Sequence, residues 1–233
     1  MISFMHLFFL NFKSTDKGNG VKLTNRTSDN ENWPIQVRDI TSILKNNNLD
    51  KIANKIAERM GNIEYDLILV NFDINSDNAT YKQQFSNEEL IREIIFLTGC
   101  PVLCIPKWRK SVPIKRILLP IHLSSNIMKD FKQVLPIAKL FNSIIHLLIL
   151  NGMPDVLPIE LSKVFMDNKI PVIPKCIDHN NIPDTILAYA SIVRADLICN
   201  AILGDRYSKP DFLNNTWKDM INRSEVPLFN YLY

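Results

Sequence analysis

Cysteine side chains could serve as nucleophiles, redox partners or metal ligands, so their spacing is the first test for chemistry in this chain. All four lie within or beside apolar runs, at Cys100, Cys104, Cys176 and Cys199. No pair shows the Cys-x-x-Cys spacing with nearby histidines that a zinc site needs. Cys100 and Cys104 are four residues apart, which on a strand separates them by more than about 13 Å, too far for a disulfide. We expect buried free thiols of a reducing cytosol, and no metal.

Histidines are the second group that could transfer protons or coordinate a ligand. His122 directly follows a short apolar run, but no carboxylate, histidine and nucleophile set accompanies it in the sequence. We therefore expect a polar residue at a loop edge, no catalytic residue and no enzyme activity. His6 and His146 recur at matching positions of two similar segments. Because both lie within apolar runs, we expect interior or interface histidines with satisfied hydrogen bonds rather than a paired site.

The chain repeats itself in a way that defines the elements around these residues. Three stretches recur in the same order: residues 3–11 at 143–151, 66–68 at 196–198 and 100–103 at 226–229. The first pair shares Ser, His, two Leu and Asn in register. A short solenoid repeat would return every 20–50 residues or so, which is not seen. The sequence therefore predicts two copies of one unit, at residues 1–106 and 115–233, joined by a basic linker at 107–114.

Composition limits the classes of function. The chain has 233 residues, 46% of them apolar, and a net charge of +3. This is enough for one or two domains with substantial cores. Five basic residues cluster at the junction of the two copies, at Lys107, Arg109, Lys110, Lys115 and Arg116. This short run favours a solvated linker over the broad basic face of a nucleic-acid-binding protein. No apolar run approaches the roughly 20 residues that cross a bilayer, and residues 1–10 lack the features of a signal peptide. We expect a cytoplasmic protein without nucleic-acid or membrane partners.

Hydrophobic periodicity predicts alternating strands and helices. In the second copy, strands are expected at 116–121, 144–150, 172–177, 196–203 and 227–232, with helices from Ser124 or Ser125 to about Leu140 and at 158–168, 182–194 and 214–223. In the first copy, strands are expected at 3–11, 35–41, 66–72 and 101–105, with helices at 48–61 and 86–97. The polar stretch 12–33 is predicted to be a mobile surface loop. Alternation of this kind favours a doubly wound α/β fold with a parallel sheet.

These segments resemble the universal stress protein family in its tandem form. The motifs that carry the resemblance are Leu119-Pro120-Ile121-His122, Ser124-Ser125, His146-Leu147-Leu148, Ala195-Asp196-Leu197-Ile198-Cys199, Tyr65-Asp66-Leu67-Ile68 and Cys100-Pro101-Val102-Leu103. The resemblance implies tandem three-layer α/β/α domains with a mostly parallel sheet of order 3-2-1-4-5. It also implies an ATP site at the carboxyl ends of strands 1 and 4, the position where the strand order reverses.

The family's nucleotide loop is largely lost in the second copy. Its first glycine aligns with Ala201, its second survives as Gly204, and its Gly-Ser/Thr pair aligns with Asn215-Thr216, or with Asn214-Asn215 if no residue is inserted. The strand-1 Asp that contacts the adenosine part in the family is His122 here. Arg206 and Lys209 follow Gly204 and could hold a phosphate by charge, although a solvated loop is the preferred interpretation.

The first copy departs further from the family. Asn71 and Ile74 occupy the first two glycine positions, and Glu88-Glu89 replace the Gly-Ser/Thr pair. Two carboxylates there would repel a triphosphate, whereas at a helix N-terminus they favour folding. The first domain is also expected to lack strand 1 and helix 1. Three explanations stay open: a late or misassigned start or a longer parent protein, a rearranged sheet in which strands 2 and 4 pair directly, or another chain filling the slot.

The resemblance and the eroded loops together lead to two hypotheses. The first is a non-catalytic protein with no cofactor and a regulatory or protein-interaction role in the stress response. The alternative is an ATP- or AMP-binding stress protein using His122, Ala201, Gly204, Arg206, Asn215 and Thr216. The terminal strand 227–232 is apolar and lies at a sheet edge in the family's topology. An unpaired apolar edge favours strand pairing, so we expect the two domains to pair within the chain, with a homodimer through edge strands as a further possibility.

Overall fold

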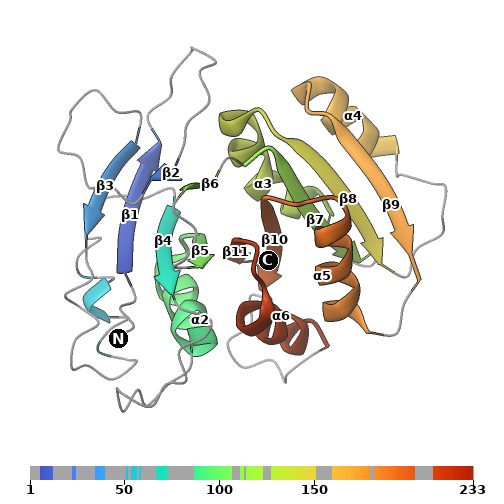
Figure 1. The fold of residues 1–233 in the computed structure, drawn as a ribbon. Coiled ribbons are helices and arrows are strands. Elements are labelled where there is room, and N and C mark those ends of the chain that lie inside the picture. Colours follow the sequence, from blue (N-terminus) through green and yellow to red (C-terminus); the bar gives the residue numbers. More distant parts are fainter. Residues whose placement is uncertain are drawn as a thin grey trace.

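The structure is a computed structural model of the chain, and it describes residues 6–12, 23–24, 35–39, 51, 54–56, 58, 67–72, 87–106, 111–112, 114–122, 127–150, 159–178, 181–202 and 212–232. The main sheet has nine strands in the order β3-β1-β4-β5-β11-β10-β7-β8-β9. Figure 1 shows this sheet running through the molecule from β3 to β9. The predicted α/β class with a mostly parallel sheet is confirmed.

The second half contains the five parallel strands that the sequence predicts. They are β7 (Arg116–His122), β8 (Ile144–Leu150), β9 (Val172–Ile177), β10 (Leu197–Ile202) and β11 (Leu228–Leu232). Numbered along the chain, they lie in the order 3-2-1-4-5. The connecting helices are α3 (Ile127–Phe141), α4 (Ile159–Asn168), α5 (Ile182–Ile192) and α6 (Phe212–Arg223).

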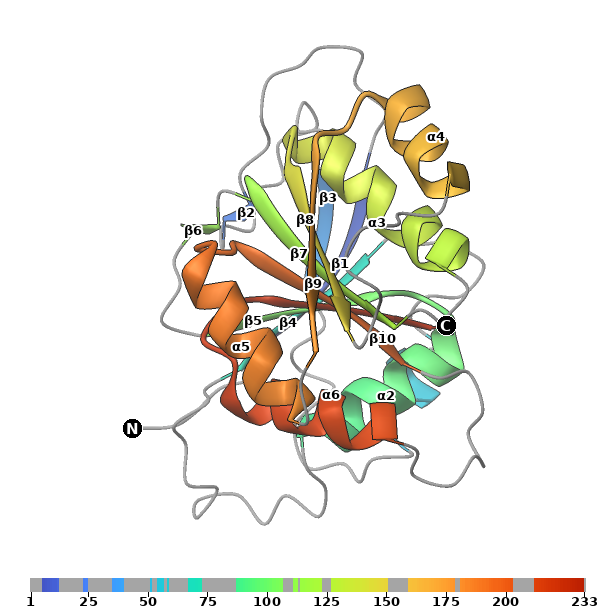
Figure 2. The same cartoon turned by 90° about the vertical axis from the view of Figure 1, so that its right-hand side faces the viewer.

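Helices cover both faces of the sheet and so form a three-layer structure. In Figure 2, α3 and α4 lie on one side of the strands, while α2, α5 and α6 lie on the other. Strand β10 shows why this arrangement needs apolar residues at consecutive positions. Leu197 and Cys199 belong to the core beneath α3 and α4, whereas Ile198 and Ile202 belong to the core beneath the other helices. Because successive side chains of a strand point to opposite faces, a strand covered on both sides must be apolar throughout.

Three of the four helices of the second half end at a non-glycine residue in the left-handed region. Asn142, Lys169 and Arg194 follow α3, α4 and α5 with φ angles of 50°, 54° and 51°. At each end a later amide reaches back to a helix carbonyl, as Ser143 N–H does to the Ala138 oxygen at 2.9 Å. This is the hydrogen-bond pattern of a Schellman cap, which ends the helix and turns the chain toward the next strand.

The first half contributes β1 (His6–Phe12), β3 (Ile35–Asp39), β4 (Leu67–Phe72), α2 (Asn87–Thr98) and β5 (Val102–Pro106). The described residues of the predicted helix 48–61 are helical, and among them Ile56 is fully buried. The strand order among these described elements is β3-β1-β4-β5, and β1 runs antiparallel to both β3 and β4. The first half therefore departs from the all-parallel 3-2-1-4-5 order.

Of the three explanations left open by the sequence, direct pairing of strands 2 and 4 describes this arrangement. Strand β1 carries the segment that repeats in β8, yet it lies beside β4, where the family would place strand 1. The physical reason is that β4 pairs β5 on one side only, and the amides and carbonyls on its other side need partners. An antiparallel strand satisfies them as well as a parallel one does.

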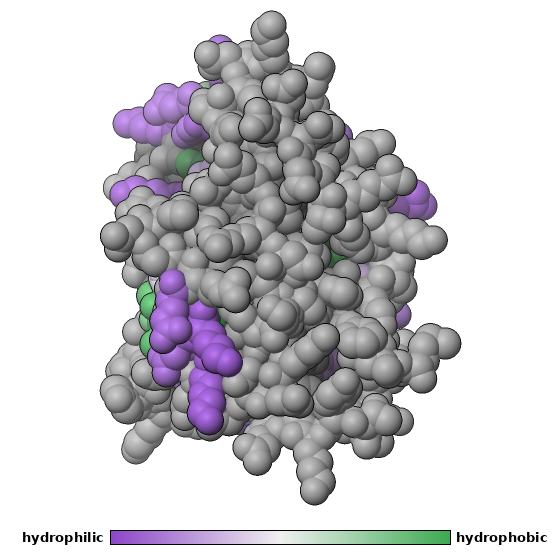
Figure 3. Space-filling view, turned by 90° about the vertical axis from the view of Figure 1, so that its left-hand side faces the viewer, coloured by the Kyte–Doolittle hydropathy of each residue, from purple (hydrophilic) through white to green (hydrophobic). Residues whose placement is uncertain are grey.

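Two segments expected to be loop and linker contact each other. Leu23–Thr24 (β2), inside the predicted loop 12–33, pairs antiparallel with Ser111–Val112 (β6) in the linker. The linker is not solvated along its whole length, because Ile114 is 1% exposed and belongs to the core beneath α3. On the side of the molecule shown in Figure 3, the described residues that reach the surface are mostly hydrophilic.

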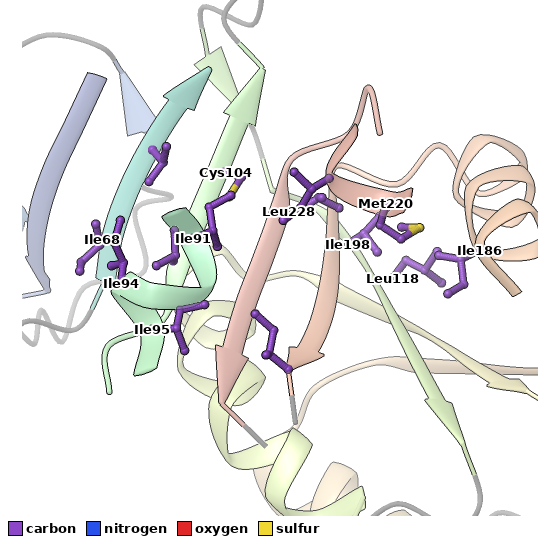
Figure 4. Close-up of a cluster of buried hydrophobic side chains, with 14 of the residues drawn as sticks. Ile68, Ile91, Ile94, Ile95, Cys104, Leu118, Ile186, Ile198, Met220 and Leu228 are labelled. Carbon is purple, nitrogen blue, oxygen red and sulfur yellow. The ribbon is translucent and has the colours of Figure 1, made fainter. Parts of the chain in front are cut away.

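The two halves join through antiparallel pairing of β5 with β11. The register is centred on Leu103 opposite Phe229, two residues that the sequence repeat places at equivalent positions. Figure 4 shows apolar side chains of one core lining both sides of this junction, including Ile91 and Cys104 from the first half and Leu228 and Met220 from the second. One core cluster therefore spans both halves.

Candidate functional site

The edge where a ligand is expected is defined by strands β7 and β10. They are parallel neighbours, with Leu197 in register with Ile117 and Ile198 with Leu118. From this pair the chain continues to β8 and β9 on one side and to β11 on the other. The carboxyl ends of β7 and β10 therefore lie at the point where the strand order reverses, which is where open α/β sheets bind ligands.

The structure brings part of the predicted site to this edge. His122 is the last residue of β7, opposite Leu150, and Ala201 is the penultimate residue of β10, opposite Tyr231. Asn215 and Thr216 lie early in α6, the next described element after β10. Gly204, Arg206 and Lys209 lie between these two elements, outside the described residues. The backbones of His122 and Ala201 thus end neighbouring strands, as the family pattern implies.

Ala201 has a packing role in the structure. Its side chain is partly buried and packs against the core beneath α3 and α4. A glycine at this position would leave the backbone amides open to a phosphate, because it has no side chain. At this position of β10 the chain therefore has a side chain packed against the core, where the family pattern has a glycine with exposed backbone amides.

In the matching region of the first half, the carboxylate of a glutamate side chain is held by residues of α6. Asn71 lies in β4 opposite His6 and Ile105, and Ile74 lies outside the described residues. Glu88, in the first turn of α2, is 8% exposed, and its carboxylate lies 2.6 Å from the Lys218 ammonium nitrogen. Asn222 also donates a hydrogen bond to it from Nδ2, at 3.0 Å. This carboxylate is committed to α6 and is not available for a ligand.

His146 is not the satisfied interior histidine that the sequence suggested. Its Nδ1 atom is buried and has no hydrogen-bond partner. Burial, followed by the nearby positive charge of Arg116, lowers the pKa of His146 below its ordinary value of 6.5. His6 begins β1, while His146 is the third residue of β8, and these two strands are second and eighth in the sheet order. The repeated histidines therefore do not form a paired site.

The lowered pKa of His146 predicts a pH dependence of stability. The unfolded chain takes up a proton on this histidine near pH 6.5, at which the folded protein still resists protonation, so acid favours unfolding. We expect the wild-type protein to lose more unfolding free energy between about pH 7.5 and 5.5 than the His146→Leu variant does. Urea unfolding at several pH values measures both curves. Parallel curves would contradict the assignment, because a constant offset between them reports only the change in packing.

Asp196 is a residue whose role the sequence interpretation missed. It is 8% exposed, and its Oδ2 accepts hydrogen bonds from the backbone amides of Lys115 and Arg116, at 3.0 and 2.9 Å. The Arg116 guanidinium lies 3.5 Å from its Oδ1. Asp196 thereby anchors the start of β7, at the sheet edge opposite the candidate site. The repeat of Asp66 as Asp196 was a signal for it, since a carboxylate retained in two otherwise drifting copies indicates a shared structural role.

A second missed feature is a pair of hydroxyl caps at equivalent positions. Thr98 Oγ1 accepts a hydrogen bond from the Cys100 amide, at 3.1 Å, where α2 leads into β5. Ser224 Oγ accepts one from the Val226 amide, at 3.2 Å, where α6 leads into β11. Each hydroxyl fixes the turn that delivers an edge strand to the junction. The signal in the sequence was the Thr/Ser match two residues before each repeated motif.

The cysteines are free thiols, as predicted, with Cys100, Cys104 and Cys199 buried and Cys176 partly buried. Burial raises the pKa of Cys104, even though Asn230 donates a hydrogen bond to its sulfur. A protonated, buried thiol is a poor nucleophile. Among the described residues no group of three or more His, Cys, Asp or Glu is placed to hold a metal ion. Within the same ranges, none of the helices has the length and apolar character to span a bilayer.

Comparisons with known proteins agree on fold and give no closer relationship. No family model matches the chain. No curated protein matches it either. A universal stress protein from Archaeoglobus fulgidus is 15% identical, with a TM-score of 0.54, and the match covers 78% of this chain and 65% of that one. A putative universal stress protein from Pseudomonas aeruginosa is 13% identical, with a TM-score of 0.50, covering 81% and 69%.

A functionally unknown protein from Pseudomonas aeruginosa is similar to the same degree, at 14% identity and a TM-score of 0.50, covering 79% of this chain and 67% of that one. At these identities the likeness shows the fold alone. The chain has the fold of universal stress proteins, and it spans less than two thirds of the Archaeoglobus structure.

Proposed function

We propose that this protein is a non-catalytic, tandem universal stress-like protein of the cytoplasm whose nucleotide sites are eroded, and that it acts by binding a protein partner in the stress response. The observation that carries the proposal is that the Glu88 carboxylate is buried and already has partners. In the position where the family pattern has a Gly-Ser/Thr pair for phosphate, this buried carboxylate is held by Lys218 and Asn222. A phosphate at that position would be repelled by the negative charge of the Glu88 carboxylate, which already occupies it.

The second half supports the same proposal because most of the loop glycines of the family pattern are replaced. Only Gly204 remains of the three loop glycines, and Ala201 packs its side chain into the core beneath α3 and α4. Phosphate binding by backbone amides needs close approach to bare backbone, which a side chain at the first loop position hinders. Charge from Arg206 would have to replace those contacts.

Nucleotide binding in the second half is the other candidate function. The observation in its favour is the position of His122 and Ala201 at the carboxyl ends of two neighbouring strands, at the point where the strand order reverses. In this alternative, His122 takes the place of the family's adenosine-contacting Asp, and Gly204, Arg206, Asn215 and Thr216 hold the phosphates of ATP or AMP.

Calorimetry with ATP and AMP separates the two functions. On the leading proposal, titration of the full chain gives no saturable heat at millimolar nucleotide. Micromolar binding that is abolished by Gly204→Val would overturn the proposal and establish the alternative. Far-ultraviolet circular dichroism of the variant controls for misfolding, and Arg206→Met tests whether charge supplies the missing contacts. Binding that survives both substitutions would place a ligand elsewhere and would contradict both candidates.

A homodimer through the edges of the nine-stranded sheet would have to use β3 or β9 among the described strands, because β5 and β11 pair with each other. Ile145 N–H donates to the Pro171 carbonyl, so alternation along β9 directs the backbone of Pro174 away from β8. Proline supplies no N–H donor to an incoming strand. The free side of β9 therefore lacks a hydrogen-bond donor that an incoming strand would need. An edge-to-edge homodimer is proposed through β3 instead.

A further inference from the structure

A polar contact in the helix layer crosses the junction between the two halves. Glu88 of α2 meets Lys218 and Asn222 of α6, which lie four residues apart and therefore on one face of that helix. The Glu88 side chain is 10% exposed and that of Lys218 is 59% exposed. The hydrogen bond from Lys218 to Glu88 and the negative charge of Glu88 raise the pKa of Lys218. The contact therefore joins a nearly buried anion of one half to a solvated cation of the other.

A second polar contact crosses the junction in the strand layer. Asn230 of β11 is fully buried, and its Nδ2 lies within hydrogen-bond distance of the Val102 carbonyl, at 3.3 Å, and of the Cys104 sulfur, at 3.2 Å. Its Oδ1 accepts a hydrogen bond from Asn200 Nδ2, at 3.0 Å. A buried amide without partners is costly, so this side chain favours the neighbour that satisfies it.

The backbone pairing alone does not specify which edges meet. The register of β5 with β11 is centred on equivalent residues, Leu103 and Phe229, so the same antiparallel pairing would fit two copies of either edge. The side-chain contacts are not symmetric. In the repeat, the second-half counterpart of Glu88 is an asparagine, Asn214 or Asn215, and the first-half counterpart of Asn230 is Cys104. A β11 edge facing its own copy would therefore present no carboxylate to Lys218.

We propose that Glu88 is a recognition residue by which the first half selects and fixes the second half through Lys218 and Asn222. A position used for phosphate in the family then serves recognition between the two halves of this chain. The asymmetric pair acts together with Asn230 to favour the β5–β11 junction over the pairing of two β11 edges. This inference rests on the contacts across the junction and does not depend on whether nucleotide binds in the second half.

Charge reversal in the full chain tests the proposal. Glu88→Lys and Lys218→Glu each place like charges across the junction and are expected to lower the melting temperature, Glu88→Lys by about 5 °C or more. The double variant Glu88→Lys/Lys218→Glu restores the opposite charges and should recover at least half of the larger single loss. Hydrogen exchange should show weaker protection of α6 and β11 in the single variants and its return in the double variant.

Glu89→Gln is the matched control for Glu88→Gln, because both residues lie in the first turn of α2 and both favour the helix dipole. Glu89 is exposed and also attracts Lys218 through its charge, but less strongly than Glu88, which is buried against α6 and hydrogen-bonded to Lys218. If the two substitutions lower the melting temperature equally, Glu88 acts only on its own helix and the proposal is wrong. Losses that simply add in the charge-reversed double variant would also overturn it, because contacting residues should couple.

Discussion

Replacing Asp196 with alanine is expected to lower the free energy of unfolding by about 3–4 kcal/mol. Its carboxylate accepts hydrogen bonds from the backbone amides of Lys115 and Arg116, and it lies within 3.5 Å of the Arg116 guanidinium. Removal leaves two amides at the start of β7 without this acceptor, in a place where the side chain is only 12% exposed. Hydrogen bonds to a charged group contribute about 1.5–3 kcal/mol each.

Urea denaturation of the full chain measures this loss, and Asp184→Ala provides the control. Asp184 also pairs with an arginine, Arg223, but both side chains are about half exposed, at 48% and 49%. Exposed pairs contribute about 0–1 kcal/mol, and Asp184 also accepts a hydrogen bond from the exposed Asn181 side chain at the start of α5, so the control should lose clearly less stability than Asp196→Ala. Equal losses for the two substitutions would show that the start of β7 does not depend on the carboxylate. A change in the denaturant slope would instead indicate that the unfolding is no longer two-state.

The sequence predicted the second half closely because each of its elements has a local signal. Strands β8 and β9 were predicted with the bounds that the structure shows, 144–150 and 172–177. Both are short, largely apolar runs between helices, and such runs have few other stable places in an α/β fold. The predicted helix ends lie within three residues of the observed ones, and the start of α5 at residue 182 was predicted correctly. Here caps such as Asn181, whose side chain accepts the Asp184 amide, decide the boundary.

The direction of β1 could not be predicted in the same way. Its residues indicate a strand, but nothing local to residues 3–11 states which neighbour it pairs or in which direction it runs. The repeat in β8 suggested a parallel strand two places from β4, whereas the structure pairs β1 directly and antiparallel with β4. Pairing is decided by which backbone groups lack partners in the folded sheet, and this is a property of the whole chain.

In the candidate site, too, the features that follow from strand order could be predicted, whereas contacts between residues far apart in the sequence could not. The resemblance placed His122 and Ala201 correctly at the ends of adjacent strands, because strand order determines which ends meet. The resemblance predicted that the loop glycines are lost, but it did not predict which contacts the replacing residues make. The Glu88 contact with Asn222 joins residues 134 positions apart. A charge pattern along one helix contains no information about a partner on another, so such contacts emerge only from the fold.

Replacing Phe229 with alanine is expected to lower the free energy of unfolding by about 3–5 kcal/mol, the usual range for a buried phenylalanine. Phe229 is 2% exposed, lies opposite Leu103 of β5, and has its ring centroid 5.5 Å from that of Tyr231. Its core cluster also contains Leu67 and Leu69 of the first half. The cavity therefore opens between the halves, and hydrogen exchange should show lower protection in β4 and β5 as well as in β10 and β11.

The control for this substitution is Ile192→Ala, since Ile192 is 76% exposed on α5 and its truncation should stay within about 0.5 kcal/mol of wild type. Chemical denaturation gives the size of the loss, and exchange gives its extent along the sheet. If the loss of protection in Phe229→Ala stops at β11, the two halves unfold separately despite sharing a sheet. If it reaches β4, the junction that unites β5 with β11 makes the nine strands one cooperative unit, because a cavity at the boundary then weakens both sides together.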